Sequence, residues 1–154
     1  MSATTICEFF VPGVPIPQGS KQGFVVQKKG ERPRAIVVDT NKDDLKPWRA
    51  HVTKTAAAAY TGPRAEGALL LTAEFRMPRP ASVKREYPAV KPDVDKLLRA
   101  LMDGITDALT IWRDDAQVVD GFPSKRYVLP GQEPGVLVRI GEYRHHPTLE
   151  GVEA

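Results

Sequence analysis

The chain has 154 residues, the length of a single domain that can bury a hydrophobic core. Hydrophobic residues make up 42% of it and charged residues 27%, which excludes an intrinsically disordered or a fibrous protein. The formal net charge of +3 fits a polyanionic partner, but many proteins share such a charge, so its distribution matters more than its total.

The N-terminal part of the chain is rich in residues that favour β-strands. Residues 4–11 predict a strand, and the proline- and glycine-rich residues 12–20 predict an exposed loop after it. Two further β-prone runs, residues 23–27 and 35–39, flank the cationic sequence KKGERPR. This pattern predicts a hairpin with a basic tip, which is either a solvated turn or a phosphate contact.

The middle of the chain combines helical and extended patterns. Apolar residues at helical spacing predict a first helix near residues 46–60, where Pro47 limits how early the helix can be regular. The apolar run GALLLTAEFRM at residues 67–77 predicts a buried strand. Residues 78–92 are rich in proline and carry several cations, which predicts a loop of the kind that often carries function.

The clearest element is a second helix near residues 94–109. Its apolar side chains recur three or four residues apart on one face, at Val94, Leu97, Leu98, Leu101, Met102, Ile105, Ala108 and Leu109. Residues 116–129 and 135–143 predict two strands joined by a turn, and we expect residues 144–154 to form a frayed tail.

Cysteine content and hydropathy indicate the compartment. Cys7 is the single cysteine, which excludes an intrachain disulfide, and the N-terminus lacks the charged and apolar regions of a secretory signal. No apolar run approaches the roughly 20 residues that cross a bilayer as a helix. We therefore expect a soluble cytoplasmic protein with no membrane contact.

Six aspartates crowd into residues 91–119 of this basic chain. Asp93 and Asp95 lie at the start of the second predicted helix, where a carboxylate caps free N–H groups and the helix dipole favours negative charge. One cap does not explain two acids. Residues two apart share one side only in an extended segment, and Pro92 favours such a segment because it restricts Lys91.

The second acidic group, Asp114 and Asp115, precedes a predicted strand. Adjacent strand residues point to opposite faces, so only one of the two can turn toward the helix N-terminus. That aspartate would join Asp93 and Asp95 in a group of three carboxylates. Such oxygen ligands suit Mg²⁺, which supports phosphodiester hydrolysis.

The polar face of the second helix carries charges of both signs. Asp95, Arg99 and Asp103 follow one another four residues apart, so a cation lies among the carboxylates. A structural interpretation also stands, in which Asp93 caps the helix, Asp103 is solvated and the later aspartate pair forms a turn. We assign Asp107 to this structural interpretation.

Two blocks of this region, KPDVDKLLRALMDGITDAL and IWRDDAQVV, resemble the RusA-type Holliday-junction resolvases, endodeoxyribonucleases common in phages and prophages. The family signature is an Asp-x-Asp that opens a helix and an Asp-Asp-Ala-Gln-Val that enters a strand. The match covers about residues 91–120, with a looser likeness in the N-terminal strand, the loop after it and the first helix. Carried over residue by residue, it implies that Asp93, Asp95 and Asp115 are metal-binding catalytic acids.

The resemblance also implies an α+β fold, with a single domain over residues 1–154 in which two main helices pack on a small mixed β-sheet. It implies Mg²⁺ dependence, with Mn²⁺ as a substitute, and a homodimer that nicks two opposed strands of a four-way DNA junction in recombination and repair. The cell would be a bacterium or a phage-infected host. A non-catalytic protein that binds branched DNA and a metal-free structural domain are the alternatives.

Two positions depart from the family pattern. Lys96 follows the second aspartate, where the family often has Asn, and Arg99 matches the family's helical lysine. Arginine keeps the positive charge and forks its hydrogen bonds, but it is not a readily titrating proton donor. A role in acid catalysis would be impaired by Arg99, whereas an electrostatic role would be retained.

Other cations are candidates for DNA contacts, because lysine and arginine offset phosphate charge. The candidates, most of them on predicted loops, are Lys21, Lys28, Lys29, Arg32, Arg34, Lys84, Arg85, Lys96, Lys125 and Arg126. Each taken singly is also compatible with a solvated side chain.

Overall fold

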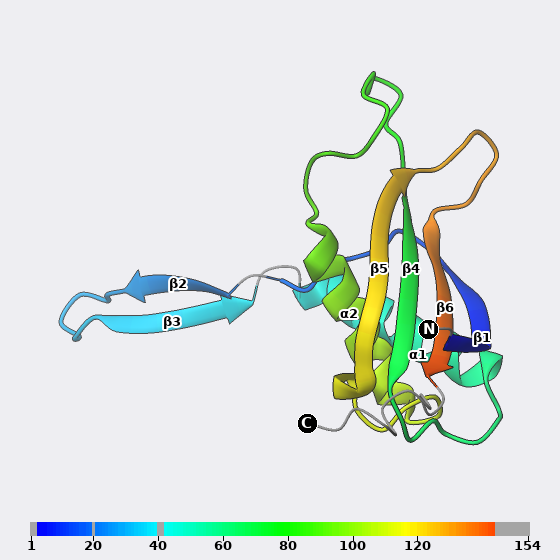
Figure 1. Ribbon diagram of the computed structural model, residues 1–154. Coiled ribbons are helices and arrows are strands. Elements are labelled where there is room, and N and C mark those ends of the chain that lie inside the picture. Colours follow the sequence, from blue (N-terminus) through cyan, green and yellow to red (C-terminus); the bar gives the residue numbers. More distant parts are fainter. Residues whose placement is uncertain (1–2, 20, 40–41, 144–154) are drawn as a thin grey trace, which may run out of the picture.

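A computed structural model describes residues 3–19, 21–39 and 42–143 (Figure 1). In chain order, its elements are β1 (Ala3–Pro12), β2 (Lys21–Val26), β3 (Arg34–Asp39), α1 (Lys42–Ala59), β4 (Leu69–Met77), α2 (Val94–Ala108), the short 3₁₀ helix η1 (Asp115–Gln117), β5 (Val118–Tyr127) and β6 (Gly135–Tyr143). The predicted frayed tail at residues 144–154 lies outside the described residues. No helix in the described part of the chain is long and apolar enough to cross a membrane.

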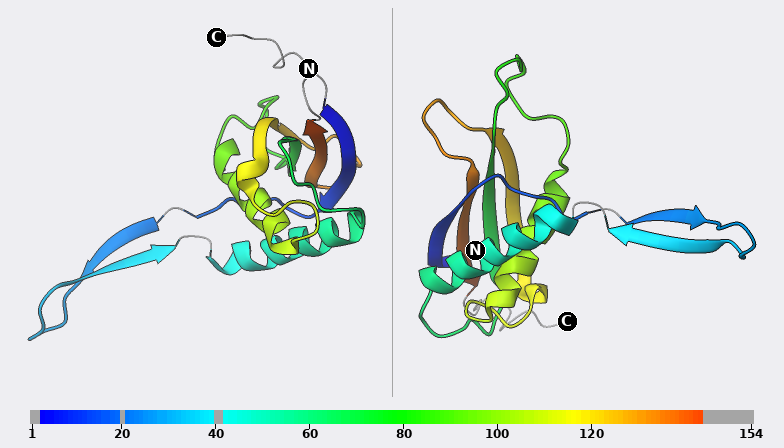
Figure 2. Two further views of the ribbon diagram at one scale, coloured as in Figure 1. Left: turned by 60° about the horizontal axis from the view of Figure 1, so that its bottom comes forward. Right: turned by 180° about the vertical axis from the view of Figure 1, so that it is seen from behind.

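Four strands form a mixed sheet in the order β1-β6-β4-β5. β6 runs antiparallel to both β1 and β4, whereas β4 and β5 are parallel. Parallel neighbours need a crossover connection, and α2 lies within the connection between β4 and β5. Both helices cover the same face of the sheet (Figure 2). The predicted α+β class, with two helices on a small mixed sheet, is confirmed.

The hydrophobic core lies between the sheet and the helices. β4 alternates between buried and half-buried residues, and its buried side chains, such as Phe75, belong to the same cluster as Val52 of α1 and Leu101 of α2. Trp112, which follows α2, is fully buried in the same cluster. The run predicted as a buried strand therefore buries one face fully.

The amphipathic helix α2 has nearly the predicted bounds. It ends at Ala108, and Leu109 after it adopts a left-handed conformation with φ 57°. Gly104 lets α2 approach α1 closely, because a Cβ there would lie 2.7 Å from Cγ1 of Val52. The predicted end of the helix at residue 109 was thus one residue too late.

α1 begins at Lys42, four residues before its predicted start. Pro47 lies inside the helix, although its ring nitrogen cannot donate the bond to the carbonyl four residues earlier. The buried side chains of Leu45 and Trp48 on either side of it anchor this end of α1 in the core cluster. Packing has therefore overridden the restriction imposed by the proline.

β2 and β3 form a separate antiparallel pair, and this arm projects away from the four-stranded sheet (Figures 1 and 2). Its strands are joined by the cationic tip, so the predicted hairpin is confirmed. The loop between β1 and β2 was predicted to be exposed, and this was only partly right. Pro15 is buried and Ile16 is packed against the core.

Candidate active site

Asp93 is the N-cap residue of α2, with extended backbone at φ −71° and ψ 141°. Its carboxylate makes no hydrogen bond to the free N–H groups of the helix, so it holds the capping position without making the capping bond. It forms an ion pair with Lys96, with 3.8 Å between Oδ2 and Nζ. Most of its oxygen lone pairs therefore remain available to another ligand.

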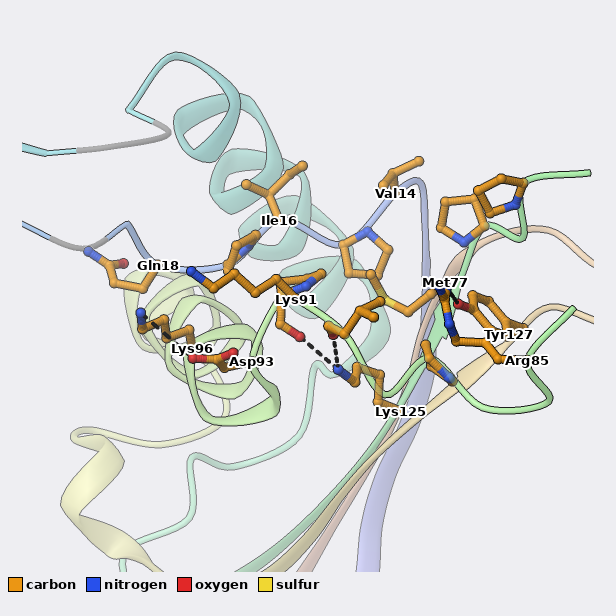
Figure 3. Close-up of a pocket in the computed structure, with 17 residues that line it drawn as sticks. Val14, Ile16, Gln18, Met77, Arg85, Lys91, Asp93, Lys96, Lys125 and Tyr127 are labelled. Carbon is orange, nitrogen blue, oxygen red and sulfur yellow. Dashed lines mark hydrogen bonds and ion pairs between the residues drawn. The ribbon is translucent and has the colours of Figure 1, made fainter. Parts of the chain in front are cut away.

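The backbone that leads into Asp93 is held by a lysine from the sheet. Nζ of Lys125, on β5, donates hydrogen bonds to the carbonyl oxygens of Val90 at 2.7 Å and Pro92 at 2.9 Å (Figure 3). On the other side of the helix start, the backbone N–H of Gln18 donates to the carbonyl of Lys96 at 3.0 Å. Two distant segments thus fix the start of α2.

Asp95 lies in the first turn of α2 and is exposed. The extended lead-in ends at Asp93, so the two acids flank the helix start and do not both lie in extended backbone. Arg99, also exposed, follows Asp95 by four residues, about one helical turn along α2.

Asp114 and Asp115 do not enter a strand directly, and that prediction was wrong. Asp114 is the N-cap of η1, and its Oδ1 accepts a hydrogen bond from the backbone N–H of Ala116 at 2.9 Å. The side-chain oxygen of Gln117 accepts from the backbone N–H of Asp114 at 3.2 Å and completes a capping box. These local bonds favour a 3₁₀ turn over a strand at this point.

Asp115 is half-buried and interacts with the polar face of α2. Its pKa is raised, first because burial disfavours the charged form, and then because of a hydrogen bond to Asp114 and repulsion by Asp114 and Asp103. The positive charge of Arg99 opposes this shift. The structure therefore brings Asp115, Arg99 and Asp103 near one another, while Asp114 is used in the cap.

Gln117, which sequence reasoning did not single out, anchors η1 to the core. Its Nε2 donates to the carbonyl oxygens of Ala65 at 2.9 Å and Gly67 at 3.1 Å. The signal for it was its place in the DDAQV block, three residues after a capping aspartate. Through these bonds Gln117 sets the position of the turn that carries Asp115.

Asp107 was predicted to have only a structural role as a solvated helix residue, but it has a specific partner on α1. Arg49 of α1 donates to it through Nε at 2.6 Å and through Nη2 at 3.0 Å. Nη1 of Arg49 also lies 3.9 Å from Oδ2 of Asp103. The pKa of Arg49 is raised, mainly by the hydrogen bond to Asp107, with burial opposing. The two acids thus join α2 to α1 through one guanidinium.

The donor chemistry of this region fits a hard divalent cation, although a complete ligand cluster is not assembled. Within residues 3–19, 21–39 and 42–143, no three or more His, Cys, Asp or Glu side chains are grouped to hold a metal ion. Asp93 makes no capping bond, and Asp115 is repelled by neighbouring acids that a cation would offset. Mg²⁺ commonly uses only one or two carboxylates together with water and substrate phosphates.

The predicted DNA-contacting cations lie at the tip of the arm, at the start of β2, and around the N-terminal end of α2. Lys28, Lys29, Arg32 and Arg34 are exposed at the tip of the arm, where Arg34 also pairs with Glu31 at 3.4 Å. Lys21 begins β2, and its side chain lies outside the described part.

The other predicted cations lie around the N-terminal end of α2 and the ends of β4 and β5. Lys84 is exposed on the loop between β4 and α2, and Nη1 of Arg85 donates to the Tyr127 hydroxyl at 2.9 Å. Arg126 donates through Nε to Oε1 of Glu74 at 2.9 Å. Arg85 and Arg126, like Lys125, therefore have intramolecular partners.

A pocket of about 570 Å³ lies beside Asp93. The loop between β1 and β2, the proline-rich loop before α2, the first turn of α2 and the ends of β4 and β5 form its walls (Figure 3). Sequence reasoning did not identify its wall residues Gln18 and Lys91. The density of prolines on both loops was the only local signal for it.

A comparison with protein-family models gives a match over most of the chain. The family model described as Endodeoxyribonuclease RusA matches residues 12–141, which include both acidic blocks, the arm and the pocket walls. No individual curated protein matches the chain significantly.

Proposed function

The chain belongs to the RusA endodeoxyribonuclease family, and we propose that it is a Mg²⁺-dependent nuclease that resolves four-way DNA junctions in recombination and repair. The observation that carries the proposal is the position and the bonding of two acids in the matched blocks, Asp93 and Asp115. Asp93 sits at a helix start without making the capping bond, and Asp115 is half-buried within electrostatic reach of Asp103 and Arg99 on the same helix. Asp93 is paired with Lys96 and Asp115 with its neighbour Asp114, whereas Asp114 accepts the backbone bond that caps η1 and Asp107 is bound by Arg49 of α1.

Asp93, Asp95 and Asp115 would hold the metal ion, and Mn²⁺ would substitute for Mg²⁺. The ion would stabilise negative charge on the phosphate and lower the pKa of an attacking water. Arg99, beside Asp115, would donate hydrogen bonds to phosphate oxygens. Because a guanidinium stays protonated, Arg99 would act through its charge and not as a proton donor.

The cations would bind the sugar–phosphate backbone of the junction arms. The exposed tip of the β2–β3 arm carries four of them away from the sheet, where they can reach a duplex beyond the active site (Figure 1). Phosphate contacts of this kind position a protein on DNA without reading the sequence. Lys84 and Lys96 would contact the strand nearer to Asp93.

Resolution of a four-way junction requires cuts in two opposed strands, so we propose that the protein acts as a homodimer. A two-fold axis would place two identical active sites in equivalent positions on the junction.

The decisive experiment incubates the pure protein with a synthetic four-way junction, with and without Mg²⁺. We expect paired nicks near the crossover only with Mg²⁺ or Mn²⁺, and weaker cutting of a linear duplex. Binding without cutting would favour the alternative, a non-catalytic protein that binds branched DNA. A protein that neither binds nor cuts the junction would contradict the proposal and would favour a structural domain.

A further inference from the structure

The pocket beside Asp93 has largely apolar walls, which suit an apolar group. Much of its lining is aliphatic, and the described lining includes the prolines Pro15, Pro17, Pro78, Pro80, Pro88 and Pro92. Proline rings are rigid, so they present apolar faces without losing side-chain freedom when a ligand binds. The volume of about 570 Å³ falls within the usual range for pockets that take small organic groups.

The polar groups of the pocket indicate an anionic ligand. Its described lining carries the cationic side chains of Arg85, Lys91, Lys96 and Lys125 and the carboxylate of Asp93. Arg85 and Lys125 also donate to neutral oxygens, and Lys96 pairs with Asp93, so the lining keeps an excess of positive charge. In Figure 3, Asp93 and Lys96 lie at one end, Arg85 at the other, and Lys91 and Lys125 between them. A ligand that combines an apolar ring with a phosphate matches this arrangement.

One wall also offers an unsatisfied acceptor. The side chain of Gln18 lines the pocket next to Lys91 and Lys96 (Figure 3), and its buried Oε1 has no hydrogen-bond partner among the described residues. A buried acceptor without a partner is destabilising. Rotation of this amide toward a donor on a ligand would remove the defect, and Gln side chains pair readily with the edges of nucleobases.

We propose that the pocket receives one nucleotide unstacked from the junction strand that is cut, with its base between the proline-lined walls. This inference rests on the proposed nuclease function and adds the substrate group that the site reads. Unstacking a nucleotide costs less where its stacking is already interrupted, as at the crossover of an open junction. Binding the base in the pocket would hold the adjoining phosphate at Asp93, in the wall of the same pocket.

The test uses junctions that carry 2-aminopurine singly at each nucleotide flanking the cut. Stacked 2-aminopurine is quenched by its neighbours, so extrusion raises its fluorescence. The complex is measured with Ca²⁺ in place of Mg²⁺ to prevent cutting. We expect a several-fold rise at one position beside the cut and little change at the others.

Pocket-filling variants locate the extruded base. Val14 and Val90 line the pocket and are 49% and 46% exposed, so Val14→Trp and Val90→Trp can fill it without disturbing the core. We expect both to abolish the fluorescence rise and to slow cutting severalfold while junction affinity stays near that of the parent. Leu129→Trp, at a 59% exposed position outside the lining, is the matched control and should keep the rise.

Gln18→Leu tests the reading of the base. It should keep the fluorescence rise and reduce the preference among junctions that differ only at the responsive nucleotide. An unchanged preference would overturn the role of Gln18.

The outcomes separate this inference from the proposed function. If the parent cuts junctions but no 2-aminopurine position responds, or if Val90→Trp folds and keeps the full rise, the pocket does not receive a nucleotide and the nuclease assignment stands. If the parent neither binds nor cuts junctions, both proposals are overturned.

Discussion

Lys125 holds Pro92 in place: its ammonium donates a 2.9 Å hydrogen bond to the carbonyl of Pro92, the residue directly before Asp93. A second bond of 2.7 Å reaches the carbonyl of Val90. The end of β5 is thereby attached to the lead-in of α2, 33 residues away in sequence. A lysine predicted to bind DNA thus has a second candidate role, which is to position an acid of the proposed active site.

Replacing Lys125 by Met should therefore slow cutting about 10- to 100-fold, because small displacements of a reacting group carry penalties of this size. Junction affinity and its salt dependence should change little. Single-turnover cutting rates and binding isotherms would measure the two effects separately. Lys125→Arg, which keeps donors, should recover part of the rate, and Lys54→Met on the exposed surface of α1 is the control. A flatter salt slope with a normal cutting rate would instead indicate direct phosphate contact.

Replacement of Asp93, Asp95 or Asp115 by Asn should reduce Mg²⁺-supported cutting by orders of magnitude, because each change removes a charged metal ligand of similar size. Junction binding should survive and can strengthen, since less negative charge faces the phosphates. Gel-shift and cutting assays on the same junction would test this. Asp114→Asn is the control, because Asn keeps an oxygen that can accept the bond from Ala116. Parent-level cutting by well-folded Asp93→Asn or Asp115→Asn would refute the metal site.

The raised pKa of Asp115 predicts how the metal-free protein responds to pH. An unfolded aspartate titrates near a pKa of about 3.9, and burial and neighbouring acids raise the folded value. The folded state thus binds the proton more tightly, so this contribution to stability is present below the unfolded pKa and is lost as pH rises through the folded one. In EDTA, Asp115→Asn should melt above the parent at neutral pH and alongside it in strong acid. A less stable variant at neutral pH would contradict burial and acid repulsion as the cause of the shift.

The arm predicts a specific salt dependence. Neutralising Lys28, Lys29, Arg32 and Arg34 together should weaken junction binding and flatten the slope of log affinity against log salt by about 0.9 for each phosphate that the tip no longer binds. Lys54→Gln on α1 should leave the slope unchanged. The slope is measured by fluorescence anisotropy over a salt series. If the fourfold variant keeps the parent slope, the tip is a solvated turn.

If the protein is a homodimer, it should sediment at micromolar concentration as a species with twice the 17.0 kDa mass of the chain. Junction DNA should bind that dimer without further association. Sedimentation of a 17.0 kDa species alone, both with and without junction DNA, would exclude the dimer.

Much of the fold was predictable because it depends on periodic burial. The apolar stripe of α2 and the apolar run of β4 specified a helix and a strand with nearly the observed bounds. The two acidic blocks were likewise recognisable, because a short motif carries its residue types and spacing within one stretch of chain. The start of α1 was misplaced because Pro47, read locally, outweighed the burial of Leu45 and Trp48.

The sequence by itself thus predicted the hairpin with its basic tip and the two acidic blocks, and through the family resemblance of those blocks it predicted the class of fold. Only the tertiary structure decided that Asp114 caps η1 while Asp115 interacts with α2, that Arg49 joins Asp107 across two helices, and that Lys125 supports the lead-in to Asp93. The pocket likewise has walls from segments that meet only when β5 packs beside β4 and α2 covers the sheet. Local patterns record which side chains are buried or paired within a few residues, whereas a polar group's partner far along the chain is set by how whole elements pack.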